Sequence, residues 1–235
     1  MGKRGKKYDE ARGQVDRSKA YPVAEGLALA KSLGFAKFDE SIDVAFRLGV
    51  NPKYSDQMVR GSCILPHGTG KVVRVLVFAK GEKAIEAEKA GADVVGDDDL
   101  VERIQGGFME FDKAVATPDM MAKVGRLGKI LGRRGLMPNP KLGTVTFDVE
   151  NAVKEAKAGR IEFKVEKAGI VHACVGRKSF SDEQVLENVG ALAEAIIKLR
   201  PASVKGAYIR TLGISTSMGP GVKIDTNELT ASFAK

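Results

Sequence analysis

The sequence Ser215-Thr216-Ser217-Met218-Gly219-Pro220-Gly221 separates two stretches that have the alternation and β-branched content of strands, residues 207–214 and 222–225. This spacing predicts a β-hairpin whose loop is these seven residues. The glycines and the proline hold the backbone open, the hydroxyls offer donors and acceptors, and Met218 can adapt to an irregular apolar surface. Such a loop suits contact with a partner. The alternative is a plain turn at Gly219-Pro220-Gly221, with Met218 packed in the core.

The overall charge of the chain points to the kind of partner. The 235 residues suffice for one large or two small domains, and the formal net charge is +8. This excess of cations favours a polyanion, nucleic acid before a membrane surface. No apolar run is long enough to span a bilayer, and the basic N-terminus is not followed by the apolar segment of a signal peptide. We therefore expect a soluble, cytoplasmic protein.

The cysteines and histidines give little support to a metal site. Cys63 and Cys174 each lie singly in an apolar, strand-like run, and His67 and His172 are more than a hundred residues apart. Neither set has the spacing of zinc ligands, and a cytoplasmic protein rarely keeps a disulfide. We expect buried, reduced thiols and no cofactor.

The two ends of the chain share one style of sheet. Half-buried alternation predicts strands over residues 42–48, 59–65, 161–165 and 170–175, the last two forming a hairpin around the turn Lys167-Ala168-Gly169. Helices are predicted over residues 21–34 and from the N-cap Ser181 to about Leu199. Residues 1–19 carry seven Lys or Arg against three acids, which is typical of a solvated arm that orders on nucleic acid.

The middle of the chain has a different pattern. Residues 72–79 are almost continuously apolar, and they are followed by a helix-forming segment, a short apolar run at 92–95, a second helix near 100–104 and a third run at 114–116. Strands that alternate with helices through short connections indicate a small parallel sheet covered by helices.

These two patterns predict an α/β protein of two domains. An outer α+β domain of a split sheet plus helices is built from residues 1–66 and 160–235, and a Rossmann-like three-layer α/β domain, residues 67–159, is inserted into it. Residues 66–159 hold 15 basic and 14 acidic side chains, a net charge of +1. The flanks therefore carry +8 minus +1, or +7, which places the polyanion site mainly on the outer domain.

The glycine-rich stretch Gly125–Gly135 does not have the pattern of a nucleotide site. A P-loop needs Ser or Thr after Gly-Lys, but Gly128-Lys129 is followed by Ile130. No Gly-x-Ser-x-Gly motif or cysteine–histidine pair suggests catalysis, so we expect no enzyme activity. The cations between Asp119 and Asp148 are either a secondary phosphate contact or a solvated loop. They are Lys123, Arg126, Lys129, Arg133, Arg134 and Lys141.

Three further residues allow two interpretations each. Phe38, beside Lys37 just before the first outer strand, could stack on a base or sugar, or it could fill the core beside Phe46. For Phe35 we favour the core. His172 is a satisfied strand histidine or an RNA contact. Because the chain has no tryptophan and four tyrosines, structured RNA suits it better than a single strand stacked on aromatic rings.

Several longer segments, in order along the chain, resemble one known family. They are Ala36-Lys37-Phe38-Asp39-Glu40, Asp56-Gln57-Met58-Val59-Arg60-Gly61, Leu65-Pro66-His67-Gly68-Thr69-Gly70-Lys71, Ala90-Gly91-Ala92-Asp93, Ala116-Thr117-Pro118-Asp119, Leu131-Gly132-Arg133-Arg134-Gly135-Leu136-Met137-Pro138-Asn139-Pro140-Lys141, Gly159-Arg160-Ile161-Glu162-Phe163 and Ser217-Met218-Gly219-Pro220. Together they look like the bacterial large-subunit ribosomal protein L1 family.

The resemblance implies a two-domain protein with a double hinge near residues 66–70 and 156–160. It implies binding to large-subunit rRNA to form the mobile stalk near the tRNA exit site, help in releasing deacylated tRNA, and repression of its own operon through the mRNA. It also implies a protein that is monomeric when free of the ribosome.

The resemblance also implies an RNA-binding set on the outer domain. Its members are Lys37, Phe38, Ser41, Lys164, Lys167, His172, Thr216, Ser217, Met218 and Gly219. The family often has threonine where this chain has Ser217, so the hydroxyl is kept and a methyl is lost. Two rival functions belong to other classes: a nucleotide-dependent enzyme built on the inserted domain, and a general nucleic-acid chaperone that works through charge alone.

Overall fold

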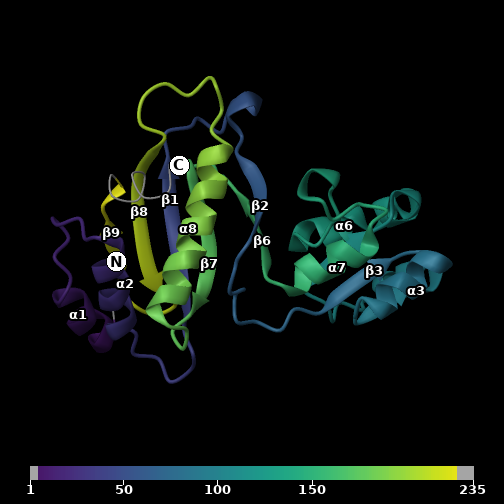
Figure 1. The fold of residues 1–235 in the computed structure, drawn as a ribbon, viewed down its shortest axis with the longest axis horizontal. Helices are drawn as coiled ribbons and strands as arrows, with labels where there is room; N and C mark the ends of the chain where they lie inside the picture. The colour runs from purple at the N-terminus through teal and green to yellow at the C-terminus, as the bar shows by residue number, and fades with distance from the viewer. Residues whose placement is uncertain (1–4, 227–235) are drawn as a thin grey trace. The chain divides into compact units, whose positions relative to one another are not determined.

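A computed structural model describes residues 5–226 of the chain and divides it into two units (Figure 1). Unit 1 is formed by Met1–Gly70 together with Ile161–Lys235, and unit 2 is Lys71–Arg160. Both units are mixed α/β, which confirms the predicted fold class.

Unit 1 contains a sheet of four strands in the order β7-β1-β8-β9. The strands alternate between buried and more exposed positions, so that Ile42, Val44 and Phe46 point into the core. β8 and β9 pair antiparallel, which confirms the predicted hairpin and leaves residues 217–221 as its loop. The bounds are β1 Ser41–Leu48, β7 Ile170–Arg177, β8 Ile209–Thr216 and β9 Val222–Ile224.

Two helices cover one face of this sheet, α2 (Val23–Ser32) and α8 (Asp182–Lys198) (Figure 1). Both were predicted. α8 begins with the expected capping box, in which the Ser181 hydroxyl accepts from the Gln184 backbone and the Gln184 side chain accepts from the Ser181 backbone. Apolar side chains of the two helices and of the sheet form one core cluster.

Two more strands, β2 (Arg60–Ile64) and β6 (Arg160–Lys164), form a separate sheet, and all of their residues except Arg160 belong to unit 1. The predicted hairpin of residues 161–175 is therefore wrong: its two strands exist but belong to different sheets. The turn between them is closed by a hydrogen bond from the Glu166 backbone N–H to the Ile170 carbonyl, and Val165 donates to Val59. The chain changes sheets within this turn. A short 3₁₀ helix, η1 (Ser55–Gln57), precedes β2.

The predicted solvated arm is wrong for residues 6–15, while residues 16–19 are exposed as expected. Residues Lys6–Gly13 form the helix α1, and Ala11 and Val15 are buried in the core of unit 1. These two apolar residues attach the otherwise polar segment. Residues 1–4 of the arm lie outside the described residues.

Unit 2 contains the predicted parallel sheet, with strand order β4-β3-β5. On the central strand, Leu76 and Phe78 face one apolar cluster, and Val75 and Val77 face another. Helices therefore cover both faces, and the unit has three layers. The elements are β3 Val75–Phe78, α3 Glu82–Lys89, β4 Val94–Gly96, α4 Asp98–Gln105, β5 Lys113–Ala116 and α7 Val149–Lys157.

The basic stretch of unit 2 is helical and not a loop. Short helices follow one another without a gap from residue 118 to residue 134, and a left-handed Gly135 ends them. Val124, Leu127 and Leu131 are buried against α4 and its neighbours. The elements are η2 Pro118–Met120, α5 Met121–Val124, η3 Gly125–Leu127, α6 Gly128–Leu131 and η4 Gly132–Arg134, with η5 Pro140–Leu142 further along.

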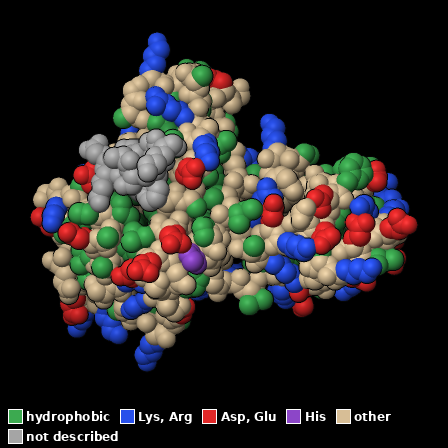
Figure 2. All heavy atoms as spheres, in the orientation of Figure 1, with side chains coloured by type: hydrophobic (Ala, Val, Ile, Leu, Met, Phe, Trp, Pro, Cys, Tyr) green, Lys and Arg blue, Asp and Glu red, His purple; other side chains and the backbone are tan. Residues whose placement is uncertain are grey.

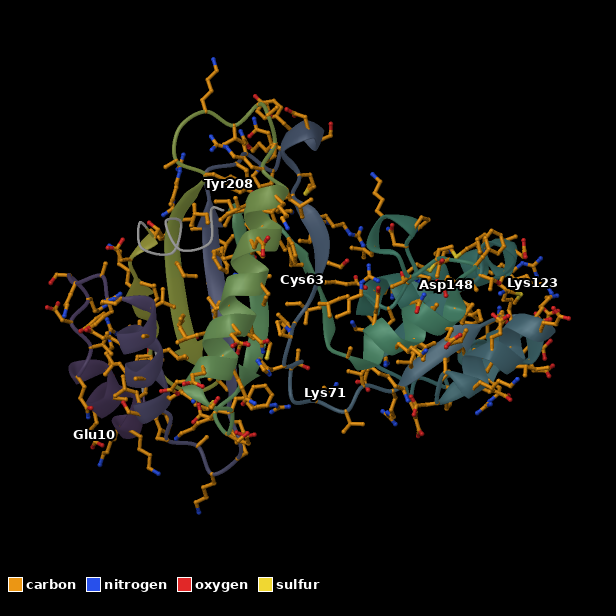
Figure 3. The ribbon with its side chains drawn as sticks, viewed as in Figure 1. Glu10, Cys63, Lys71, Lys123, Asp148 and Tyr208 are labelled. Carbon is orange, nitrogen blue, oxygen red and sulfur yellow. The ribbon has the colours of Figure 1, made fainter. Side chains whose placement is uncertain are left out.

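Both cysteines are half-buried free thiols in unit 1. Cys63 lies on β2 (Figure 3), with its sulfur 3.5 Å from the Ala191 carbonyl of α8. Burial raises the pKa of both thiols, so they remain protonated near neutral pH.

A buried side chain fixes the segment that leaves unit 1 toward unit 2. Asn188 of α8 is fully buried and donates to the carbonyls of Val175 and Gly68, at 2.7 and 2.9 Å. Its oxygen accepts from the His67 backbone at 3.1 Å. The path of the chain is thus set up to Gly68.

Replacing Ser181 with Ala should lower the free energy of unfolding of unit 1 by about 1 kcal/mol, because the Gln184 N–H loses its acceptor. All four tyrosines (Tyr8, Tyr21, Tyr54 and Tyr208) lie in unit 1, so tyrosine fluorescence in urea reports this unit alone. Ser203→Ala, at an exposed position, is the control. Equal midpoints for the two variants would contradict the role of the cap.

Candidate nucleic-acid interface

The antiparallel pairing of β1 and β8 brings two distant segments together. Ile42 lies opposite Thr216, so the residues just before β1 sit beside the loop that follows β8. The Ser217 N–H donates to the Ser41 carbonyl at 3.1 Å, and the Ser41 N–H donates to the Ser217 hydroxyl at 3.0 Å. Seven of the ten predicted site residues lie on these two segments: Lys37, Phe38 and Ser41 on the first, and Thr216, Ser217, Met218 and Gly219 on the second.

The carboxylate of Glu40 joins these two segments directly. Its side chain has no exposed surface, and its two oxygens accept from the backbone N–H of Ala36 at 2.7 Å and of Met218 at 3.0 Å. The Thr216 hydroxyl, whose oxygen makes no well-formed hydrogen bond among the described residues, lies close by. A single side chain thus holds the backbone on both sides of the site.

The environment of Glu40 keeps it ionised. Burial alone would raise the pKa of its carboxyl group, but the N–H groups of Ala36 and Met218, the Thr216 hydroxyl and the Lys178 ammonium together outweigh burial. The pKa of Glu40 therefore lies below its ordinary value. Sequence reasoning did not single out Glu40, although an acid beside Phe38-Asp39 could have been suspected of turning inward.

Around this buried carboxylate, apolar side chains face outward. Phe38 is 57% exposed and Met218 is 51% exposed, so neither fills the core. Phe35, in contrast, packs against the core as we favoured. The exposed apolar side chains and the exposed Ser217 together give the surface a mixed apolar and polar character.

The loop also needs its glycine for a local reason. Thr216 is only 2% exposed, and a Cβ at Gly219 would come within 2.4 Å of its hydroxyl oxygen. Any side chain at position 219 would therefore displace Thr216 or the loop. The structure buries Thr216 almost completely in unit 1, so this residue supports the loop from within and does not contact a partner directly.

The remaining three predicted residues lie away from these two segments. Lys164 and Lys167 are exposed, and the turn that holds Lys167 adjoins the far end of β1, where Arg47 pairs with Ile170. Six residues of strand, about 20 Å, separate this end from Ser41. His172 lies opposite Ala45, and its Nε2 is 3.6 Å from Glu166.

A shallow groove lies on the sheet face that points away from the core, and it extends from Gly221 in the loop to Ile170 and Arg47. Its floor is formed by the small residues Ala45 and Gly213, which lie opposite each other, and the next partners outward are His172 on one side and Lys223 on the other. Arg47 lines the groove as well. Sequence reasoning missed Arg47 and Lys223, although period-two alternation places both on the face opposite the buried residues.

Charge is mixed elsewhere on the surface. Figure 2 shows Lys and Arg side chains interspersed with Asp and Glu on the face in view. None of the described helices is long and apolar enough to cross a membrane. Within residues 5–226, no group of three or more His, Cys, Asp or Glu side chains is arranged to hold a metal ion.

These features define a class: a two-unit α/β protein with a mixed apolar and basic surface suited to a polyanion. Comparison with known proteins then gives the family. Residues 29–220 match the family described as Ribosomal protein L1p/L10e. The chain is 56% identical over 229 residues to the large ribosomal subunit protein uL1 of Solidesulfovibrio magneticus, an alignment that covers 97% of each chain. The chain belongs to the ribosomal protein L1p/L10e family.

Family membership also answers the question of catalysis. Proteins of this family are structural and RNA-binding, so the chain is not an enzyme, as expected from its motifs.

Replacing Glu40 with Gln should destabilise unit 1 by about 2 kcal/mol at pH 7, because the amide NH₂ must face one of the two buried N–H donors. The lowered pKa of Glu40 sets the sign of the pH dependence: its stabilisation is present above the ordinary carboxyl value of about 4.5 and is lost as the pH falls through the folded-state pKa. The difference in the free energy of unfolding between wild type and variant should therefore become smaller below pH 4.5. Tyrosine fluorescence in urea measures this difference. A difference that does not change with pH would refute the claim that Glu40 is ionised when it holds the two segments.

Proposed function

We propose that the chain is a large-subunit ribosomal protein that binds a structured segment of large-subunit rRNA through unit 1. The family supports rRNA binding in general. The observation that carries the proposed site is the Glu40 carboxylate, which holds Phe38 and Met218, both exposed, on two segments that are joined at Ser41 and Ser217. This arrangement is not expected if Phe38 and Met218 fill the core or if the loop is a plain turn.

The chemistry of the site suits RNA more than DNA. Backbone groups of residues 217–219 and the nearby serine hydroxyls can meet riboses and 2′-hydroxyls, which distinguish the two nucleic acids. Ser41 and Ser217 already bond to each other, with their oxygens 2.9 Å apart, so each retains part of its hydrogen-bonding capacity for a ligand. Phe38 and Met218 would shield these bonds from water.

The cations set affinity and orientation. Lys37 adjoins Phe38 in the chain, while Lys167 and His172 lie toward the other end of the four-stranded sheet and Lys164 ends β6, three residues before Lys167. An RNA segment about 20 Å long could touch both groups while crossing the groove beside Arg47 and Lys223.

On this basis the finer functions are proposals of ours as well. The rRNA segment is the mobile stalk near the tRNA exit site, where the protein assists release of deacylated tRNA. The same surface binds the mRNA of the protein's own operon and represses its translation. The outer domain, residues 1–66 and 160–235, binds the RNA, and hinges near 66–70 and 156–160 join it to the domain of residues 67–159. Asn188 supports this, because it fixes the chain where the first hinge begins. The free protein is a cytoplasmic monomer.

Met218→Ala and Phe38→Ala should each weaken binding to a transcript of the large-subunit rRNA stalk by about ten-fold, ~1.4 kcal/mol, at low and at high salt alike. Filter binding in excess tRNA measures this. The matched controls are Met58→Ala and Tyr54→Ala, which remove exposed side chains of similar kind outside the site. If site and control variants lose affinity equally, or if wild type binds unrelated duplexes as tightly, the protein is a charge-only chaperone.

Lys164→Ala should reduce the slope of log K against log salt by about one unit, because one phosphate contact is lost. Lys198→Ala, on the exposed side of α8, removes the same charge and should leave the slope unchanged. A slope that Lys164→Ala does not alter would remove this lysine from the phosphate contacts. The enzyme alternative is tested by equilibrium dialysis with ATP or NAD, for which we expect no binding.

A further inference from the structure

Among the described residues, four exposed cations on unit 2 form no ion pair, whereas most other cations of this unit do. Ion pairs hold many of the latter, as in Lys80–Asp97, Lys83–Glu86, Lys154–Glu150 and Lys157–Asp93. Lys123, labelled in Figure 3, is likewise held by Asp97 and Asp98. In the described unit, no such pair is found for Arg126, Lys129, Arg133 and Arg134, which are all exposed.

These four cations lie on one helical segment, residues 121–134. Its elements α5, η3, α6 and η4 follow without interruption, and its buried side is formed by Val124, Leu127 and Leu131. Arg126, Lys129 and Arg133 are spaced by three and four residues, so they lie in a row along the helix surface. The row is about 10 Å long, from a rise of 1.5 Å per residue. It is a linear array of positive charge.

The structure of unit 2 does not require glycine at the positions between these cations. Gly125, Gly128 and Gly132 have right-handed helical backbones, in which alanine would be more favourable. A Cβ built at any of the three meets nothing within 4 Å. Because neither backbone geometry nor packing requires glycine, the bare backbone beside the cations leaves room for a partner to approach closely.

We propose that residues 121–135 form a second RNA-binding surface, on which Arg126, Lys129 and Arg133 contact phosphates of one strand and the glycines admit the sugar edge of the backbone. A row of regularly spaced cations beside an open backbone suits an RNA strand, because its phosphates are also regularly spaced and are recognised by shape. The proposal rests on the proposed function only for the choice of RNA as the polyanion. It is independent of the site on unit 1.

The test compares two triple variants of the full chain with the same change in net charge. One is Arg126→Gln, Lys129→Gln and Arg133→Gln, and the other is Lys83→Gln, Lys89→Gln and Lys154→Gln on α3 and α7. Binding to the transcript of the large-subunit rRNA stalk is measured at four salt concentrations. The first variant should lose at least ten-fold in affinity at 150 mM salt and about two to three units of salt slope. The second should match wild type within two-fold.

A glycine variant separates charge from access. Gly125→Ala, Gly128→Ala and Gly132→Ala together should raise the melting temperature of unit 2 in calorimetry, because the helix gains propensity. They should nonetheless weaken RNA binding at least five-fold, with the salt slope unchanged.

The outcomes distinguish this inference from the proposed function. If wild type does not prefer the stalk transcript to unrelated RNA, the proposed function fails. If wild type binds and the first triple variant behaves like the second, only the surface on unit 2 is refuted, and its cations would then serve an acidic protein or no partner. Unchanged binding by the glycine variant would refute the close approach of the RNA backbone.

Discussion

The arrangement of the two segments of the candidate site depends on one buried carboxylate. Glu40 is ionised and has no exposed surface, so it must be compensated by donors, and these are the backbone N–H groups of Ala36 and Met218. A buried charge of this kind penalises every arrangement in which either segment moves away. The consequence is a rigid frame that leaves Phe38 and Met218 free to face outward.

The two units present surfaces of different chemical character. Unit 1 builds a surface of mixed character, with apolar side chains, hydroxyls and a groove between cations, which is the composition expected of a specific RNA site. Unit 2 encloses its sheet with helices on both sides, and its segment of residues 121–135 presents four exposed cations for which no ion pair is found within the described part of the chain. Specificity would come from the first surface, and the second would add affinity that depends on salt.

Much of the fold was predictable, because strands such as β1 and β3 carry clear alternation or continuous apolar runs and α8 carries a capping box. The arm of residues 6–15 was not, since two small apolar residues do not reveal what they pack against. The helical segment around Gly128 was hidden by glycines that disfavour helices. The types of residue in the loop at Met218 predicted a contact surface, but they did not decide whether Phe38 is exposed or packed in the core. The role of Glu40 could not be predicted, because it depends on the register between β1 and β8, which no local pattern encodes.

Amide hydrogen exchange of the wild-type protein, with and without the transcript of the large-subunit rRNA stalk, tests the central claim most directly. The account predicts that RNA protects residues 36–41 and 216–219 together and by the same factor, because Glu40 makes them one surface. Protection of only one of these segments, or protection that follows exposed lysines throughout unit 1 without regard to these segments, would contradict it.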